Sequence, residues 1–159
     1  MSIDNAVLGI QLFTMLRKVD FTGSVDTNPY LYRHFGLNCI VMYTNGRQVP
    51  SKALSLNTAD TKTCAMAYQT LVRGLGIQHG NTGIHITPPH FKKGSFMVIF
   101  DLTPDGCASD GHTSLPNNGN HHIELKCDEA HSEAVTILLY REFDSSIQID
   151  RLRNIRTDF

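Results

Sequence analysis

The chain has 159 residues, of which 41% are hydrophobic and 18% charged, and its formal net charge is -1. This length fits one domain with a substantial core, and the composition excludes a disordered tail. The near-zero charge excludes a global field that would attract the chain to nucleic acid or to an acidic membrane, although a local basic patch remains open.

The N-terminal residues do not resemble a leader. Asp4 precedes the first apolar run, Gln11 interrupts it, and no basic segment or small-residue cleavage site accompanies it. The run is also too short to span a membrane. We therefore expect a soluble, intracellular protein that is not secreted. Its cysteines are expected to be reduced thiols, and they are Cys39, Cys64, Cys107 and Cys127.

The first candidate element is residues 10–16, IQLFTML. This segment is apolar on both sides and fits either a buried strand or a short helix, since periodicity cannot decide at this length. Residues 22–29, TGSVDTNP, are typical of a loop.

A β-hairpin is predicted around Asn45-Gly46. The preceding residues 37–43, LNCIVMY, are rich in β-branched and aromatic side chains. An Asn-Gly pair after such a run favours a two-residue turn, because both central residues need a positive φ. Pro50 should end the second arm or restrict it to a sheet edge.

Residues 60–74 form the one convincing helical pattern. Its apolar side chains fall on one face at helical spacing, and they are Cys64, Ala67, Tyr68, Leu71 and Val72. Thr58 or Asp60 can cap the start of this helix, and Gly74 or Gly76 can end it.

Further strands are expected after Pro88-Pro89, at residues 95–102, 121–127, 134–143 and 147–151. In the second of these, alternation places Ile123, Leu125 and Cys127 on one face and His122, Glu124 and Lys126 on the other. Residues 116–119, PNNG, predict a turn. Six or so strands and one inserted helix near 60–74 predict a mainly β fold, an antiparallel β-sandwich or jelly roll.

The segment 107–131 holds two cysteines and four histidines, and it is the candidate metal site. A zinc site would use Cys107, His112, His122 and Cys127. Their spacings do not repeat the usual C-x2-C pair, and the alternation places His122 and Cys127 on opposite faces. We therefore favour solvated loop histidines and one buried cysteine, and we keep the metal site as the minority hypothesis.

Nucleophilic catalysis is a weaker alternative. Cys107 or Ser109 with His112 and Asp105 or Asp110 has the residue types for acyl transfer, but no strand–turn–helix elbow surrounds the nucleophile. The sequence therefore predicts neither an enzyme nor a cofactor.

Two other patterns favour structural explanations. Residues 74–83, GLGIQHGNTG, follow a helix and lack G-K-[ST], so helix-ending turns explain them better than a phosphate loop. Arginines and acidic residues alternate in the tail, which predicts a solvated strand edge with ion pairs. These residues are Arg141, Asp144, Asp150, Arg151, Arg153, Arg156 and Asp158.

Five segments in order carry a resemblance to a known family: VDTNPY, HFGLNCIVMYTNGRQVPS, FMVIFDLTPDG, NHHIELK and AVTILLYREFDSSIQIDRLRN. They resemble the C-terminal part of the major capsid protein of Polinton (Maverick) elements and adintovirus-like viruses, including copies integrated in animal genomes. The resemblance covers about residues 4–154. FDLTPD followed by FDSSIQIDRLRN is its most specific part.

The resemblance implies a double jelly-roll capsid subunit, of which residues 1–159 would be one domain, most of the second jelly roll, truncated at its N-terminal side. It implies trimeric capsomers built from copies of this chain or related subunits, localisation in the virion, and no cofactor, catalysis, small-molecule substrate or membrane contact. It also implies a strand at 10–16 and an inserted helix at 60–74. Strand edges left open by the truncation would need a partner.

Three departures from the family pattern accompany the resemblance. The first jelly roll is missing, a short spacer is missing between Gly9 and Ile10, and Cys127 and His131 replace an aromatic and a small or apolar residue. We expect the sheet edges and the loops 22–29, 78–93 and 103–120 to make the subunit contacts. The alternatives are a host-recruited β-sandwich binding module and the metal protein described above.

Overall fold

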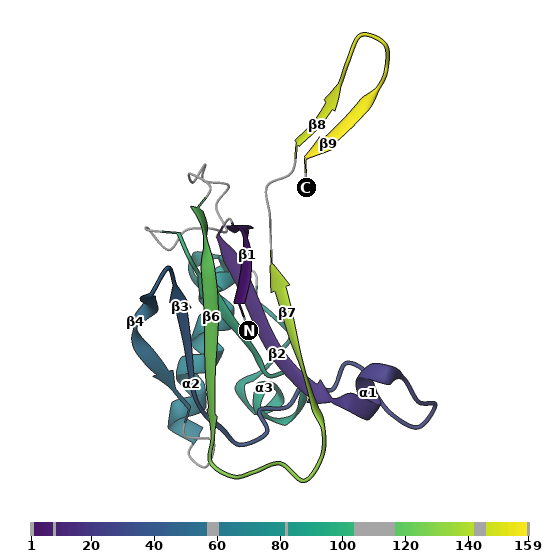
Figure 1. The fold of residues 1–159 in the computed structure, drawn as a ribbon. Coiled ribbons are helices and arrows are strands. Elements are labelled where there is room, and N and C mark those ends of the chain that lie inside the picture. Colours follow the sequence, from purple (N-terminus) through teal and green to yellow (C-terminus); the bar gives the residue numbers. More distant parts are fainter. Residues whose placement is uncertain are drawn as a thin grey trace.

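The computed structural model describes residues 2–7, 9–56, 61–81, 83–103, 117–141 and 146–158 (Figure 1). The strands in these residues are β1 (Ser2–Val7), β2 (Ile10–Arg17), β3 (Leu37–Thr44), β4 (Arg47–Ser55), β5 (Met97–Asp101), β6 (Asn117–Cys127), β7 (Val135–Arg141), β8 (Ser146–Ile149) and β9 (Ile155–Asp158). The helices are α1 (Lys18–Thr22), α2 (Thr61–Gly74) and α3 (Pro88–Gly94), with a 3₁₀ turn, η1 (Ile77–His79).

The strands form two main sheets and a separate hairpin. The first sheet has the order β1-β6-β3-β4, the second has the order β5-β2-β7, and β8 pairs with β9. All of these strand pairs are antiparallel. The expectation of a mainly β, antiparallel architecture is confirmed.

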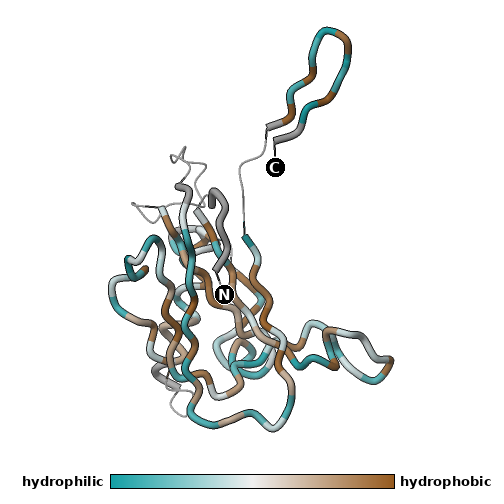
Figure 2. The backbone as a smooth tube through the Cα atoms, viewed as in Figure 1, coloured by the Kyte–Doolittle hydropathy of each residue, from teal (hydrophilic) through white to brown (hydrophobic). Residues whose placement is uncertain are grey.

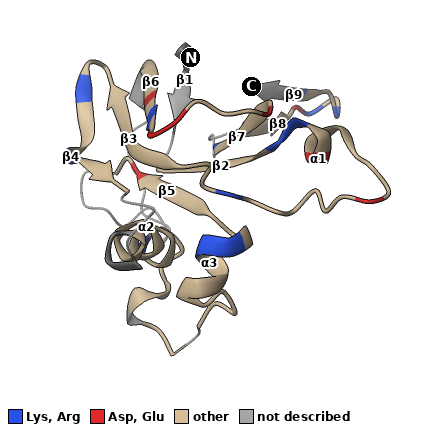
Figure 3. Ribbon diagram, turned by 90° about the horizontal axis from the view of Figure 1, so that it is seen from below, with Lys and Arg blue, Asp and Glu red and all other residues tan. Residues whose placement is uncertain are grey.

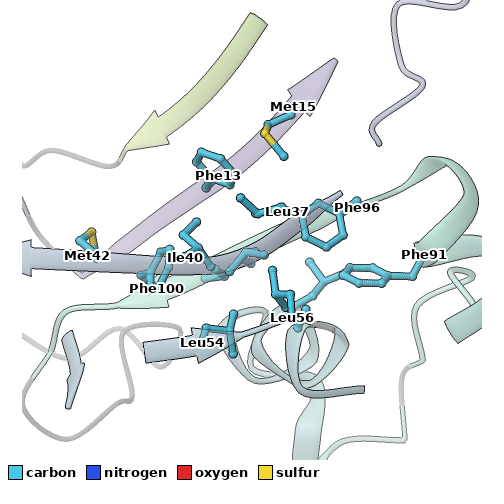
Figure 4. Close-up of a cluster of buried hydrophobic side chains, with 14 residues drawn as sticks. Phe13, Met15, Leu37, Ile40, Met42, Leu54, Leu56, Phe91, Phe96 and Phe100 are labelled. Atoms are coloured by element: carbon cyan, nitrogen blue, oxygen red, sulfur yellow. The ribbon is translucent and has the colours of Figure 1, made fainter. Parts of the chain in front are cut away.

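The two main sheets share one apolar core (Figure 4). Phe13 from β2, Ile40 and Met42 from β3, and Val98 and Phe100 from β5 are all buried in it. Removing a side chain of this size from water stabilises the fold by about 1.5–3 kcal/mol. The core therefore joins strands that are far apart in the sequence.

α2 forms where the sequence predicts a helix and packs against β5. The predicted face is the one that packs, since Cys64, Ala67 and Leu71 are buried and Tyr68 and Val72 are partly buried. At Gly74 the approach is so close that an added Cβ would overlap the side chain of Ile99. The two suggested capping residues at the helix start, Thr58 and Asp60, lie outside the described residues.

The predicted hairpin joins β3 and β4. Asn45 and Gly46 have φ values of 51° and 75°, as the turn requires, and Thr44 pairs with Arg47 across it. Pro50 does not end β4, which continues to Ser55. β4 is instead the edge strand of its sheet, as expected if Pro50 restricts the strand to an edge.

Residues 10–16 are a strand, as the resemblance implies. β2 pairs with β5 on one side and with β7 on the other, so it is the central strand of its sheet. Phe13 and Met15 face one side and Leu16 the other, and all three are buried. Burial on both faces explains why the segment is apolar on both sides.

The turn predicted at 116–119 is wrong for the three residues that the structure describes. Asn117, Asn118 and Gly119 belong to β6 and pair with Val7, Ala6 and Asn5 of β1. The sequence does not predict β1, and of the β6 residues that pair with it only His121 and His122 lie in the predicted strand. The expected contact loop 103–120 is therefore a strand from Asn117 onward, and residues 104–116 lie outside the described part.

The expectation of a single helix is also wrong. α1 begins directly after β2, where Arg17 donates to the buried carboxylate of Asp20 at 2.8 and 2.9 Å. α3 starts at Pro88 inside the expected loop 78–93, because proline fits the first helical position, where its missing N–H is not needed. None of the helices in the described ranges is long and apolar enough to cross a membrane.

α3 is fixed to the fold by aromatic contacts. Phe91 is buried, and its ring centroid lies 5.5 Å from that of Tyr68 on α2 and 5.4 Å from that of Phe96. Tyr68 also donates to the carbonyl of Ile86, at 2.9 Å. These contacts explain why a glycine- and proline-rich segment is held against the core.

The C-terminal strands follow the prediction in part. Residues 95–102 and 134–143 contain β5 and β7, and residues 147–151 contain most of β8. β8 ends at Ile149 because Asp150 begins a turn, and a further strand, β9, returns alongside it. In Figure 1 this β8–β9 hairpin lies beyond the end of β7, away from the two main sheets. We refer to residues 146–158 as the arm.

Candidate functional site

The structure describes half of the predicted metal site and separates the two residues that it describes. Cys107 and His112 lie outside the described residues. His122 is exposed on β6, with its ring centroid 6.1 Å from that of Tyr43, whereas Cys127 packs against the core from the opposite face. Within the described ranges, no three His, Cys, Asp or Glu residues are grouped so that they could hold a metal ion.

The acyl-transfer alternative falls wholly outside the described residues. Its candidates are Cys107, Ser109, His112, Asp105 and Asp110. It therefore stays a weak prediction from the sequence.

The described cysteines are free thiols, as expected: Cys39, Cys64 and Cys127. Burial raises the pKa of the Cys127 thiol, and the neighbouring Asp128 carboxylate raises it further. Cys127 is therefore protonated at neutral pH and is a poor metal ligand and nucleophile.

The glycine-rich segment 74–83 ends a helix, as predicted. α2 ends at Gly74, and Gly76 takes a left-handed conformation with φ of 67° before η1. The N–H of Gly76 donates to the carbonyl of Arg73, at 3.0 Å. These contacts satisfy the last turn of α2.

A buried polar cluster lies between the two main sheets, and the sequence analysis did not identify it. Gln11 on β2 is directly opposite Arg141 on β7, and both face the other sheet, where β6 contributes His121. Gln11 and His121 are 0% and 1% exposed. Alternation along β6 could have revealed His121, because it has the same parity as Ile123.

Several atoms of this cluster have no hydrogen-bond partner in the described part of the chain. They are both amide atoms of Gln11, Nε2 of His121, and Nε and Nη1 of Arg141. Nδ1 of His121 lies 3.2 Å from the hydroxyl of Thr44. Burial lowers the pKa of His121, the positive charge of Arg141 lowers it further, and burial also lowers the pKa of Arg141. The imidazole is therefore held neutral.

The solvated strand edge predicted for the tail is found in the arm, where Arg151, Arg153 and Arg156 are exposed, but not at Arg141. Arg141 is partly buried in the cluster. Asp150 uses its carboxylate in the turn of the arm, where Oδ1 accepts from the N–H groups of Leu152 and Asn154 at 2.8 Å each. Its Oδ2 accepts from the side chain of Asn154, at 2.8 Å. These hydrogen bonds lower the pKa of Asp150 and fix the shape of the turn.

The arm has one apolar face, which is exposed. Ile149 is directly opposite Ile155, and Ile147 lies two residues before Ile149, so all three side chains share one face. They are 66–69% exposed, and Leu152 in the turn is 83% exposed. The other face carries Gln148 opposite Arg156. Figure 2 shows the resulting alternation of apolar and polar residues along the arm.

A second exposed surface lies along β7. β7 is an edge strand, since the order of its sheet is β5-β2-β7, and nothing in the described part pairs with its free edge. Ile137 and Tyr140 on this strand are 50% and 59% exposed. At the start of β7, the N–H of Lys18 donates to the carbonyl of Ala134. This bond continues the pairing of β2 with β7 into α1, on which Phe21 is exposed.

Charges of opposite sign lie on the arm and on the segment that precedes β7 (Figure 3). The turn of the arm carries exposed Arg151 and Arg153. The segment between β6 and β7 carries exposed Asp128, Glu129 and Glu133. These sites are at opposite ends of β7, because the acidic segment precedes Val135 and the arm follows Arg141.

Comparison with protein-family models, with curated protein sequences and with solved structures gave no match. The resemblance to capsid proteins therefore rests on the sequence segments alone. The candidate functional site of this chain is an exposed contact surface, formed by the arm and the free edge of β7.

Proposed function

We propose that the chain is a structural subunit that acts by binding other copies of itself or related subunits, as in a capsid-like shell. The observation that carries this proposal is the apolar face of the arm. Three isoleucines on one face of a two-stranded hairpin are about two-thirds exposed. A two-stranded hairpin is at best marginally stable in water, so such a face is expected to be covered by another protein surface.

The sequence resemblance supports the same proposal. Its most specific segment, FDSSIQIDRLRN, includes β8 and the turn of the arm, which lie outside the core of this chain. Residues that do not stabilise their own domain are well suited to contacts between subunits. We therefore propose that the chain is a capsid protein of the kind found in Polinton elements and adintovirus-like viruses. It would form trimeric capsomers and be located in the virion.

The strand pairing supports a jelly-roll type of sandwich. In a jelly roll, antiparallel pairs are nested and alternate between two sheets. The pairs β2·β7 and β3·β6 are nested in this way and belong to different sheets. β4 departs from this pattern, because it pairs with β3 in the same sheet.

Analytical ultracentrifugation tests the function. The purified chain would be sedimented alone and joined to the first jelly-roll domain that the resemblance places before it. We expect discrete oligomers, with trimers in the joined form, and ring- or shell-like particles by negative-stain electron microscopy. A protein that remains monomeric in both forms up to high concentration would contradict the proposed function.

A further inference from the structure

We propose that the arm of one copy adds to the free edge of β7 in a second copy, with β8 antiparallel to β7. This inference rests on the proposed function and names the contact through which the subunits would associate. Both surfaces belong to this chain, and each is incomplete in the described structure. The arm lacks a cover for its apolar face, and β7 lacks a neighbour on one edge.

The arm is already built as a binding element. Its strands are paired from Ser146↔Asp158 to Ile149↔Ile155, and its turn is closed by hydrogen bonds to Asp150. The turn thus fixes the register of the two strands, and binding at a sheet edge would stabilise a pairing that is marginal in the isolated hairpin. An ordered strand pair with one apolar face is suited to strand addition at a sheet edge.

The free edge of β7 is long enough to take β8. β7 has seven residues and β8 has four, after which the chain turns at Asp150. Strand β8 placed antiparallel along β7 brings the tip to the start of β7. Ile147 and Ile149 would then lie beside exposed Ile137 and extend the apolar core past the edge of β7.

The charges agree with this direction. The tip carries Arg151 and Arg153, and Glu133, two residues before β7, lies close enough to act on the charge of Arg17, which pairs with Val135 at the start of β7. An antiparallel β8 places these opposite charges together, whereas a parallel β8 would place the arginines at the far end of β7. Exposed charge pairs fix the register and the rate of association more than its strength.

The structure favours a second copy as the acceptor. Four residues, 142–145, separate β7 from β8, and the arm lies beyond the end of β7 instead of alongside it (Figure 1). In one molecule, therefore, the edge of β7 is not covered by its own arm, which extends away from it. An arm that binds a second copy would use the same contacts as an arm that folds back onto its own β7. The experiment must therefore separate these two cases.

The first test compares the two faces of the arm in the full chain by sedimentation equilibrium. Ile147→Ser with Ile149→Ser should weaken self-association at least tenfold. Gln148→Ser with Arg156→Ser changes the polar face of the same hairpin and should alter association less than threefold. Equal association of both double variants would overturn the arm contact. If the wild type and both variants still form trimers, the proposed function survives and only this inference fails.

The second test uses charge reversal in trans. Arg151→Glu with Arg153→Glu, and separately Glu133→Arg, should each weaken self-association at low salt. An equimolar mixture of the two variants should recover mixed oligomers, detected by native mass spectrometry. A monomeric wild type whose Ile147 and Ile149 amides are protected from hydrogen exchange would show that the arm closes on its own chain, and it would overturn the inference.

Discussion

Gln11 provides a direct test of the reasoning about the buried polar cluster. The side chain is fully buried, and neither amide atom has a hydrogen-bond partner in the described part of the chain. Each unpartnered buried polar group costs about 1–3 kcal/mol, so the two together cost roughly 2–6 kcal/mol. Methionine is unbranched and similar in volume, and a volume-conserving core substitution costs less than about 1.5 kcal/mol. Gln11→Met should therefore stabilise the protein by about 0.5 kcal/mol or more.

Thr14 is the matched control on the same strand. It is also buried, but its hydroxyl donates to the carbonyl of Phe96 at 2.6 Å. Thr14→Val keeps the shape and removes the hydroxyl that donates to that buried carbonyl, so it should destabilise the protein by about 1–3 kcal/mol. Urea unfolding measures both changes, with a midpoint shift of about 0.5 M per kcal/mol for an m-value near 2 kcal/mol/M. If Gln11→Met were as destabilising as Thr14→Val, the view of an unsatisfied cluster would be refuted.

Three further predictions concern pH and glycine positions. The folded protein lowers the pKa of His121 below its ordinary value of about 6.5. Stability should therefore be full above pH ~6.5 and should fall as the pH drops below it. His121→Gln should reduce the fall in Tm between pH 7.5 and 5. Gly74→Ala should cost about 1–3 kcal/mol in urea unfolding despite the better helix propensity of alanine, and less in an Ile99→Ala background. Gly46→Ala should cost about 1 kcal/mol because its φ is 75°, whereas Gly83→Ala, which has open space and no positive φ, should be neutral by the same measurement.

The elements that could be predicted are those whose signal is local. Asn45-Gly46 specifies its turn by the φ values that the two residues tolerate. The buried face of α2 follows from helical spacing over about two turns, and the alternation along β6 separates His122 from Cys127 as expected. In each case one short stretch of the sequence contains the whole pattern.

The missed elements depend on distant partners. β1 has the sequence SIDNAV, which contains no apolar alternation, and it is a strand because its backbone pairs with residues 117–122 far along the chain. α3 begins at Pro88, in a segment whose composition indicates a loop, and it is held by Phe91 in the core. Local propensity is overruled in both cases by tertiary contacts.

The contact surface was predictable only in part. The sheet edges were expected to make contacts, and Ile147 and Ile149 lie in a predicted strand. The apolar face of the arm also needs Ile155, which is opposite Ile149 only because Asp150 closes the intervening turn. The alternating arginines and aspartates of this tail predict a solvated edge, and Arg151 and Arg153 are indeed exposed, but the sequence does not show that Asp150 binds backbone N–H groups.

An open strand edge and an exposed apolar arm on one chain are a hazard unless each is covered, because both invite uncontrolled association. The contact proposed here covers one arm and one edge at a time, and these surfaces lie at different places on the chain. Two copies can exchange arms reciprocally, which closes a dimer, or each copy can pass its arm to the next, which closes only as a ring. A trimer, as the capsid resemblance implies, requires the ring. The mass of the smallest stable oligomer therefore distinguishes the two arrangements: three copies indicate arms passed in one direction, and two copies indicate reciprocal exchange.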